Sequence, residues 1–159
     1  MSTQLESELH GTDPTSVFRE FLSEATPSSV YYLVDLPWPY VAAMTEASTE
    51  FDAEELPELR LLARRETLVS LRQSFLGSAR AANLVEADTL AVREREPVGD
   101  TPLIVGEDQI RVPLLLDGTG AAIVSAQGSF AESAPESITD AWEHGEQFAL
   151  RTPALGRIR

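Results

Sequence analysis

Residues Val30-Tyr31-Tyr32-Leu33-Val34-Asp35-Leu36 form an almost continuous run of β-branched, aromatic and aliphatic side chains. A strand that is apolar on both faces is typical of the centre of a parallel sheet, which helices cover on both sides. A second, shorter apolar run follows at residues 59–63 and ends at Arg64. We therefore predict two strands here, and expect them to be parallel neighbours.

Apolar residues recur at helical spacing before, between and after these two strands. One helix is predicted to begin at Asp13-Pro14, an N-cap followed by a proline at the first helical position, and to run to about Ala25. Residues 37–40 contain two prolines and are predicted to form a loop that leads into a helix over 41–48. The longest helix is predicted over 66–83. The order helix-strand-helix-strand-helix favours a parallel sheet.

The second half of the chain has the pattern of an antiparallel sheet. Four further strands are predicted at residues 89–94, 103–105, 109–116 and 121–125. The turn signals are Gly106-Glu107-Asp108 and residues 117–120, each between two apolar runs. A last helix is predicted over 135–148. The sequence thus predicts an α/β domain with a single mixed sheet, parallel in its first half and built of antiparallel hairpins in its second half, with helices packed on it.

The charged residues indicate a protein made for molar salt. The 159 residues include 26 acidic and 12 basic side chains, a net charge of −14, and all the basic ones are Arg. A carboxylate-covered surface stays hydrated in molar salt, where the Debye length shrinks to about 3 Å and self-repulsion nearly vanishes. Arg also pairs well with carboxylates. We interpret this composition as haloarchaeal; the alternative is a GC-rich codon bias that replaces Lys by Arg.

Several classes of function are excluded or disfavoured. The chain has no Cys, which excludes disulfides, Cys–Zn sites and a thiol nucleophile. It has no apolar run of membrane-spanning length, and its polar residues 1–12 carry no signal-peptide pattern, so we expect a cytoplasmic protein with a disordered start and no membrane partner. An acidic surface is also a poor partner for nucleic acid.

No motif indicates catalysis, a metal or a cofactor. His144 follows Glu143 on the predicted last helix, but no nucleophile is flagged beside it, and a solvated surface histidine is the favoured interpretation. The Gly118-Thr119-Gly120 stretch precedes a strand in a chain without Lys, so we interpret it as a hairpin turn and not as a phosphate loop.

One group of residues forms a candidate ligand site. Ligands of open α/β sheets bind beyond the carboxyl ends of the parallel strands. The first predicted strand ends at Asp35 and leads to Trp38 and Tyr40, whereas the second ends at Arg64 and Arg65. Guanidinium pairs suit carboxylate or phosphate ligands, and the aromatic rings could stack on a sugar or base. Alternatively, the Arg pair neutralises nearby acids and Trp38 covers the core.

Three segments carry a resemblance to a known family: ELRLLA at 58–63, SARAANLV at 78–85 and FALRTPALGRIR at 148–159. Over residues 28–159 the chain resembles haloarchaeal transcription regulators of the TbsP type. The resemblance implies an amino-terminal α/β domain that dimerises or senses a metabolite, in the style of the phospholipase-D-like effector domains of TrmB-type regulators. The phospholipase D signature needs His-x-Lys, so a fold of that kind would be catalytically silent in this Lys-free chain.

The resemblance also implies a division of the chain. Residues 13–150 are expected to form the effector and dimerisation domain, and residues 151–159 a linker toward a helix-turn-helix domain that this sequence does not contain. We accordingly expect a homodimer that binds a small anionic metabolite and contacts DNA only through that other domain. Two alternatives stay open: a small carboxylate-dependent enzyme acting on an anionic metabolite, and a stand-alone adaptor that binds other proteins.

Overall fold

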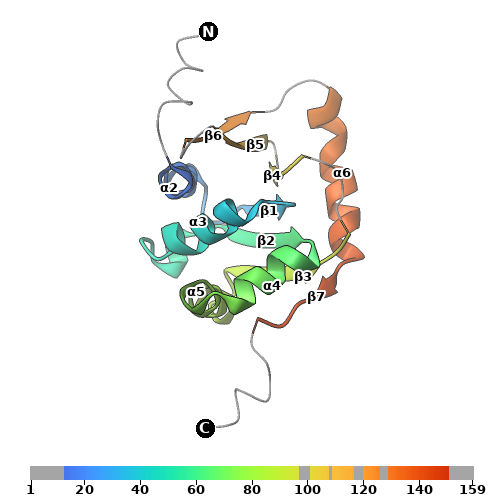
Figure 1. Cartoon of the computed structure of the whole chain (residues 1–159). Coiled ribbons are helices and arrows are strands. Elements are labelled where there is room, and N and C mark those ends of the chain that lie inside the picture. Colours follow the sequence, from blue (N-terminus) through green and yellow to red (C-terminus); the bar gives the residue numbers. More distant parts are fainter. Residues whose placement is uncertain (1–12, 97–100, 108, 117–119, 126–128, 151–159) are drawn as a thin grey trace.

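A computed structural model describes residues 13–96, 101–107, 109–116, 120–125 and 129–150, and the side chains of these residues except 129 to 134. The described part of the chain forms one seven-stranded sheet with the order β6-β5-β4-β1-β2-β3-β7 (Figure 1). The strands are β1 (Val30–Val34), β2 (Glu58–Ala63), β3 (Leu90–Glu94), β4 (Leu103–Val105), β5 (Ile110–Leu115), β6 (Ala121–Ser125) and β7 (Glu146–Gln147). The helices are α2 (Pro14–Glu24), α3 (Trp38–Ser48), the short 3-10 helix η1 (Ala53–Glu55), α4 (Arg65–Gln73), α5 (Phe75–Glu86) and α6 (Ser129–Glu143).

The sheet is mixed, as the sequence predicts, but the strand at 89–94, which the sequence pattern groups with the antiparallel strands, is parallel to its neighbour. Strand β1 is parallel to β2, with Val34 opposite Leu62, and β2 is parallel to β3. Strand β4 is antiparallel to β1, and the two hairpins β4–β5 and β5–β6 continue the antiparallel half. The predicted α/β fold with a single mixed sheet is therefore confirmed.

Helices cover both faces of this sheet (Figure 1). The main core, which includes Phe18, Leu33 and Leu61, lies between the sheet and the layer made by α2, α3, α4 and α5. On the other face, α6 packs against β1 and β2 through Ile138, which contacts the Val34 cluster, and through Trp142, which contacts the Leu62 cluster. Adjacent residues of β1 thus face two different cores, which explains why the strand is apolar throughout.

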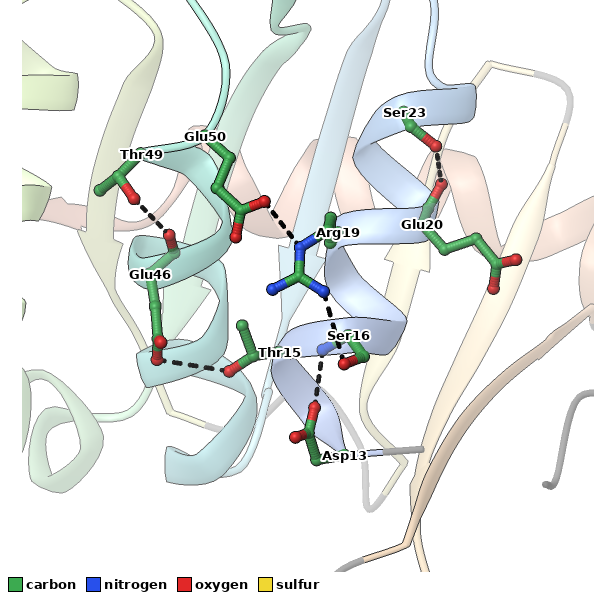
Figure 2. Close-up of polar contacts among 9 residues, drawn as sticks. All are labelled: Asp13, Thr15, Ser16, Arg19, Glu20, Ser23, Glu46, Thr49 and Glu50. Atoms are coloured by element: carbon green, nitrogen blue, oxygen red, sulfur yellow. Dashed lines mark hydrogen bonds and ion pairs between the residues drawn. The ribbon is translucent and has the colours of Figure 1, made fainter. Parts of the chain in front are cut away.

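Two helices, α2 and α3, are joined along their exposed sides (Figure 2). Asp13 caps α2, because its side chain accepts a hydrogen bond of 2.8 Å from the N–H of Ser16. The guanidinium of Arg19 donates to the carboxylate of Glu50 at 2.7 Å, just beyond the end of α3. Both side chains of this pair are 43% exposed, so the pair contributes little to stability in salt.

Arginines hold α6 against the sheet. The guanidinium of Arg93 lies 4.4 Å from the ring centre of Trp142, and its NH1 donates to the Trp142 carbonyl at 2.6 Å. Arg60 lies 5.8 Å from the same ring and 5.3 Å from the ring of Tyr32. These cation–π contacts span β1, β2, β3 and α6, and they link the last helix to all three parallel strands.

The predicted loop over 37–40 is wrong. Helix α3 begins at Trp38, with Pro37 as its N-cap and Pro39 in its first turn. Proline is accommodated there because the first N–H groups of a helix have no partner within the helix. The two prolines therefore begin the helix instead of preventing it.

The predicted long helix over 66–83 is two helices. Ser74 ends α4 and is the N-cap of α5, and its hydroxyl accepts a hydrogen bond of 3.1 Å from the N–H of Gly77. The backbone of Ser74 is extended (φ −80°, ψ 118°), so the chain turns between the two helices. Both helices are amphipathic, and their apolar spacing hides the break.

The predicted last helix over 135–148 also has different bounds, since α6 ends at Glu143 and is followed by β7. Gly145 allows the chain to leave α6 and enter β7. A Cβ atom at this position would lie 3.1 Å from the side chain of Leu62, a closer approach than most Cβ atoms make. Phe148 therefore lies beyond the helix, and its N–H donates to the carbonyl of Val92 at 3.3 Å.

The predictions for residues 1–12, for the linker 151–159 and for the turn around 117–119 lie outside the described residues. None of the helices in the described ranges is both long enough and apolar enough to cross a membrane.

Candidate anion-binding groove

An open groove lies where β2 and β3 end and α4 begins. Its lining residues are Arg64, Arg65, Glu66, Val69, Glu94, Arg95, Glu96, His144 and Glu146. The parallel pairing explains the convergence, because the carboxyl ends of β2 and β3 lie at the same edge of the sheet. Arg64 and Arg65 directly follow β2, and Arg95 directly follows β3. We call this surface the arginine groove.

The start of α4 opens onto the arginine groove. Arg64 is the N-cap of this helix, but its side chain cannot accept a hydrogen bond, and none caps the helix. The N–H groups of the first turn therefore have no side-chain partner at the cap, and the helix dipole places a partial positive charge there. Such a helix start favours a bound anion.

Three guanidinium groups flank this helix start. The NH1 of Arg65 lies 3.2 Å from Glu94 Oε2, and the side chain of Arg65 is 67% exposed, so this ion pair is weak. Neither Arg64 nor Arg95 has an ion pair within the described ranges. The N–H of Arg95 donates to the carbonyl of Ala63 at 3.0 Å, which holds the backbone of Arg95 beside the end of β2. Two unpaired guanidiniums thus border the start of α4.

The arginine groove also carries negative charge. Glu66, Glu96 and Glu146 are exposed along it, in addition to the paired Glu94. His144 lines the same groove, with its Nδ1 at 2.9 Å from the carbonyl oxygen of Asp140. The local field therefore has both signs, and an anion approaching the arginines passes exposed carboxylates. In molar salt this repulsion is screened over about 3 Å, so the short-range contacts decide binding.

The structure brings together two of the five residues predicted for the ligand site. Arg64 and Arg65 line the groove, whereas Asp35, Trp38 and Tyr40 do not. Asp35 follows β1 in the left-handed region (φ 54°), and its N–H donates to the carbonyl of Leu62 at 3.0 Å. Trp38 stands in the first turn of α3, partly buried against the main core.

Tyr40 lies in the core and not at the rim of the sheet, which corrects its predicted place. Its side chain is fully buried, and its single hydroxyl hydrogen is shared between the carbonyl oxygens of Leu114, at 2.8 Å from the hydroxyl oxygen, and Ala122, at 3.0 Å. Burial raises the pKa of Tyr40 to about 12. The correction follows from the early start of α3, because a helix that begins at Trp38 turns the next aromatic ring toward the sheet.

The carboxyl end of β1 differs from those of β2 and β3 because the start of β4 lies beside it. The helices that link β1 to β2 and β2 to β3 all cover the same face, so no topological switch point opens between these parallel strands. Strand β4 begins at Leu103, opposite Val34, so the chain re-enters the sheet at the carboxyl end of β1. Sequence reasoning missed Arg95, although it follows a predicted strand just as Arg64 does.

Comparison with solved structures shows which kind of protein has this fold. TrmBL2, described as an archaeal chromatin protein with a novel mode of DNA binding, matches with a TM-score of 0.57 at 14% sequence identity. The match covers 91% of this chain and 59% of that protein, so the chain spans little more than half of its length. At this identity the likeness shows the fold alone.

The amino-acid sequence shows to which family the chain belongs. The model of the transcriptional regulator TbsP-like N-terminal family matches residues 6–153, and the chain belongs to this family. The resemblance to TbsP-type regulators is thereby confirmed, and with it the assignment to a family of transcription regulators. No curated protein matches the chain.

Proposed function

We propose that this chain is a non-catalytic effector and dimerisation domain of a haloarchaeal transcription regulator, and that its arginine groove binds a small anionic metabolite. Membership of the TbsP-like N-terminal family supports the regulatory part of this proposal. The acidic, Lys-free composition supports the halophilic part.

A single observation carries the ligand-binding part. The guanidiniums of Arg64 and Arg95, which form no ion pair with any described residue, border the start of α4, and no side chain in the described part of the chain caps this helix. Backbone N–H groups and guanidinium groups are the donors that proteins use for phosphates and carboxylates. The exposed glutamates of the groove limit the affinity for any ligand that reaches them, which favours a compact anion over a long one.

A thermal-shift assay in molar KCl tests this proposal. Inorganic phosphate, glycerol 3-phosphate and citrate serve as probes, with glycerol as the neutral control. A probe that binds the folded domain at a concentration of about 100 times its Kd raises Tm by roughly 5–10 °C. We expect at least one anion to do so and glycerol to have no effect.

Two variants locate the effect. Arg64→Gln combined with Arg95→Gln removes both unpaired guanidiniums and is expected to abolish the shift. Arg19→Gln removes a guanidinium on the helical layer, where Arg19 pairs with Glu50, and should keep the shift. A shift of the same size in all three proteins would place the binding elsewhere and contradict the proposal.

The enzyme alternative receives no support from the geometry of the described residues. No group of three or more His, Asp or Glu side chains in these ranges could hold a metal ion. His144 contacts the backbone carbonyl of Asp140, and its side chain is 66% exposed, which is typical of a solvated histidine. Release of phosphate from glycerol 3-phosphate by the chain, lost in His144→Ala, would revive this alternative.

Contact with DNA is proposed to lie outside this domain. A net charge of −14 opposes binding to phosphates, whose neutralisation by basic residues supplies most of the affinity in DNA complexes. Gel-shift titration of the chain with double-stranded DNA is therefore expected to show no complex.

A stand-alone adaptor that binds other proteins is the second candidate function. The exposed apolar side chains of α5 favour it.

A further inference from the structure

Helix α5 carries most of the exposed large hydrophobic side chains. In the described ranges there are four such residues, and three of them lie on α5: Phe75 is 85% exposed, Leu76 57% and Val85 39%. The fourth, Leu115, lies on β5 and is 46% exposed. Several such residues on one 12-residue helix indicate a surface for protein binding.

The same helix is electrically neutral in a strongly acidic protein. Only Arg80 and Glu86 are charged in α5, and their charges cancel. The chain as a whole carries −14, so two copies repel one another over most of their surfaces. A neutral helix with apolar side chains is the kind of surface at which two copies can approach.

One side of α5 combines a projection with a hollow. Phe75, Ala79, Ala82 and Glu86 are spaced by four, three and four residues, and so lie along one side of the helix. The exposed ring of Phe75 projects at the start of this stripe. At its other end, Ala82 and Glu86 border a second hollow. The lining of this hollow is mixed: its apolar residues are Ala82, Val85, Leu90, Ala91, Val92, Phe148, Ala149 and Leu150, and its polar residues are Glu86, Asp88, Arg93 and Gln147.

These features fit a second copy of the same chain. In an antiparallel pair of α5 helices related by a two-fold axis, Ala79 of one copy lies opposite Ala82 of the other. Their small side chains permit close approach of the two helices. In this register Phe75 of one copy lies opposite Glu86 of the other, at the border of its hollow, and Leu76 lies opposite Val85. A two-fold interface uses the same patch on both copies, and a projection and a hollow at opposite ends of one helix meet that requirement.

We propose that α5 is the homodimer interface, with Phe75 of each copy inserted into the hollow of the other copy that Val85 and Glu86 line. This inference rests on the dimerisation proposed above and specifies where it occurs. Figure 1 agrees with it, since α5 lies at the end of the helical layer opposite α2. Screening by salt removes the repulsion between the acidic copies, so the dimer forms in molar KCl and dissociates on dilution of the salt.

Light scattering coupled to size-exclusion chromatography in molar KCl tests the interface. We expect the mass of two chains for the native sequence and of one chain for Phe75→Glu, which removes the ring and places a carboxylate near Glu86 and Asp88 of the hollow. Leu115→Glu is the matched control, because it adds the same charge at an exposed leucine outside α5 and should keep the mass of two chains. Far-UV circular dichroism checks that each variant is folded.

The outcomes separate this inference from the proposed function. A native protein with the mass of one chain overturns both dimerisation and the α5 interface. A dimer that persists in Phe75→Glu overturns the α5 interface alone.

A cross-linking experiment leaves Phe75 unchanged and serves if Phe75→Glu fails to fold. The chain has no Cys, so Ala79→Cys supplies its only thiol. A short bismaleimide should join two Ala79→Cys chains and leave Leu115→Cys unjoined. Equal yields for the two variants would overturn the α5 interface.

Discussion

The hydroxyl group of Tyr40 donates to the carbonyl oxygen of Leu114 at 2.8 Å and thereby joins α3 to the antiparallel half of the sheet. Tyr40→Phe removes the hydroxyl hydrogen that this carbonyl shares with the carbonyl of Ala122. We expect the variant to lose about 1–2 kcal/mol of unfolding free energy near neutral pH, the usual cost of an unmet buried hydrogen bond. Urea denaturation in molar KCl measures the difference.

The same hydroxyl predicts a pH dependence. Burial raises the pKa of Tyr40 to about 12 from the ordinary value of 10.0, because the phenolate is poorly solvated in the core. The unfolded chain loses this proton first as the pH rises, so the stability present below pH 10 declines up to about pH 12. Two pKa units correspond to about 3 kcal/mol. The difference between native and Tyr40→Phe proteins should therefore shrink above pH 10, and a constant difference up to pH 12 would contradict the assignment.

Arg93 and Trp142 offer a second test of what holds the fold together. Arg93→Lys keeps the charge but loses the planar stack on the indole, and we expect a loss of about 1–2 kcal/mol of unfolding free energy. Arg80→Lys on α5, where the described residues provide no ion pair or stacking contact, should change stability by less than about 0.5 kcal/mol. Equal losses in the two variants, measured by urea denaturation, would show that the stack does not anchor α6.

Ser74 separates α4 from α5, and replacing it tests how much its side chain stabilises the start of α5. Ser74→Ala removes the hydroxyl that accepts the Gly77 N–H, so we expect a loss of about 1 kcal/mol of unfolding free energy. Ser74→Asp restores an acceptor at the cap and should recover most of this loss. If Ser74→Asp is as unstable as Ser74→Ala in thermal unfolding, the cap does not carry the effect.

The charge balance predicts how stability depends on salt. The net charge of −14 repels itself in dilute buffer, whereas molar KCl screens it within about 3 Å. We expect Tm to rise steadily from about 0.1 M to molar KCl, where the Debye length falls from about 10 Å to about 3 Å. A Tm that is independent of KCl would contradict the halophilic interpretation of the composition.

The sequence predicted the sheet well because its signals are local. The apolar run at β1 and the alternation in the later strands define a mixed sheet before any contact is known. The break at Ser74 was missed because two amphipathic helices in sequence have the same spacing as one. Strand β7 was missed because two residues, Glu146 and Gln147, carry no periodicity.

The candidate site was predicted only in part. Arg64 and Arg65 were found because they follow an apolar strand, and the same rule applied to Arg95 would have completed the set. Tyr40 was misplaced because its position depends on where α3 begins, which two prolines obscured. His144 lines the groove because the end of α6 packs close to the sheet at Gly145. This contact is long-range in the sequence, so no local pattern predicts it.

The arginine groove is tested most directly by NMR titration of the ¹⁵N-labelled chain with the anion that gives the largest thermal shift, in molar KCl. We expect the largest changes in amide chemical shift at Arg65, Glu66 and Thr67 in the first turn of α4, and at Arg95. We also expect these changes to disappear in the Arg64→Gln, Arg95→Gln double variant. Shifts concentrated at another part of the sheet, with the α4 amides unmoved, would contradict the claim that the arginine groove is the sensor site.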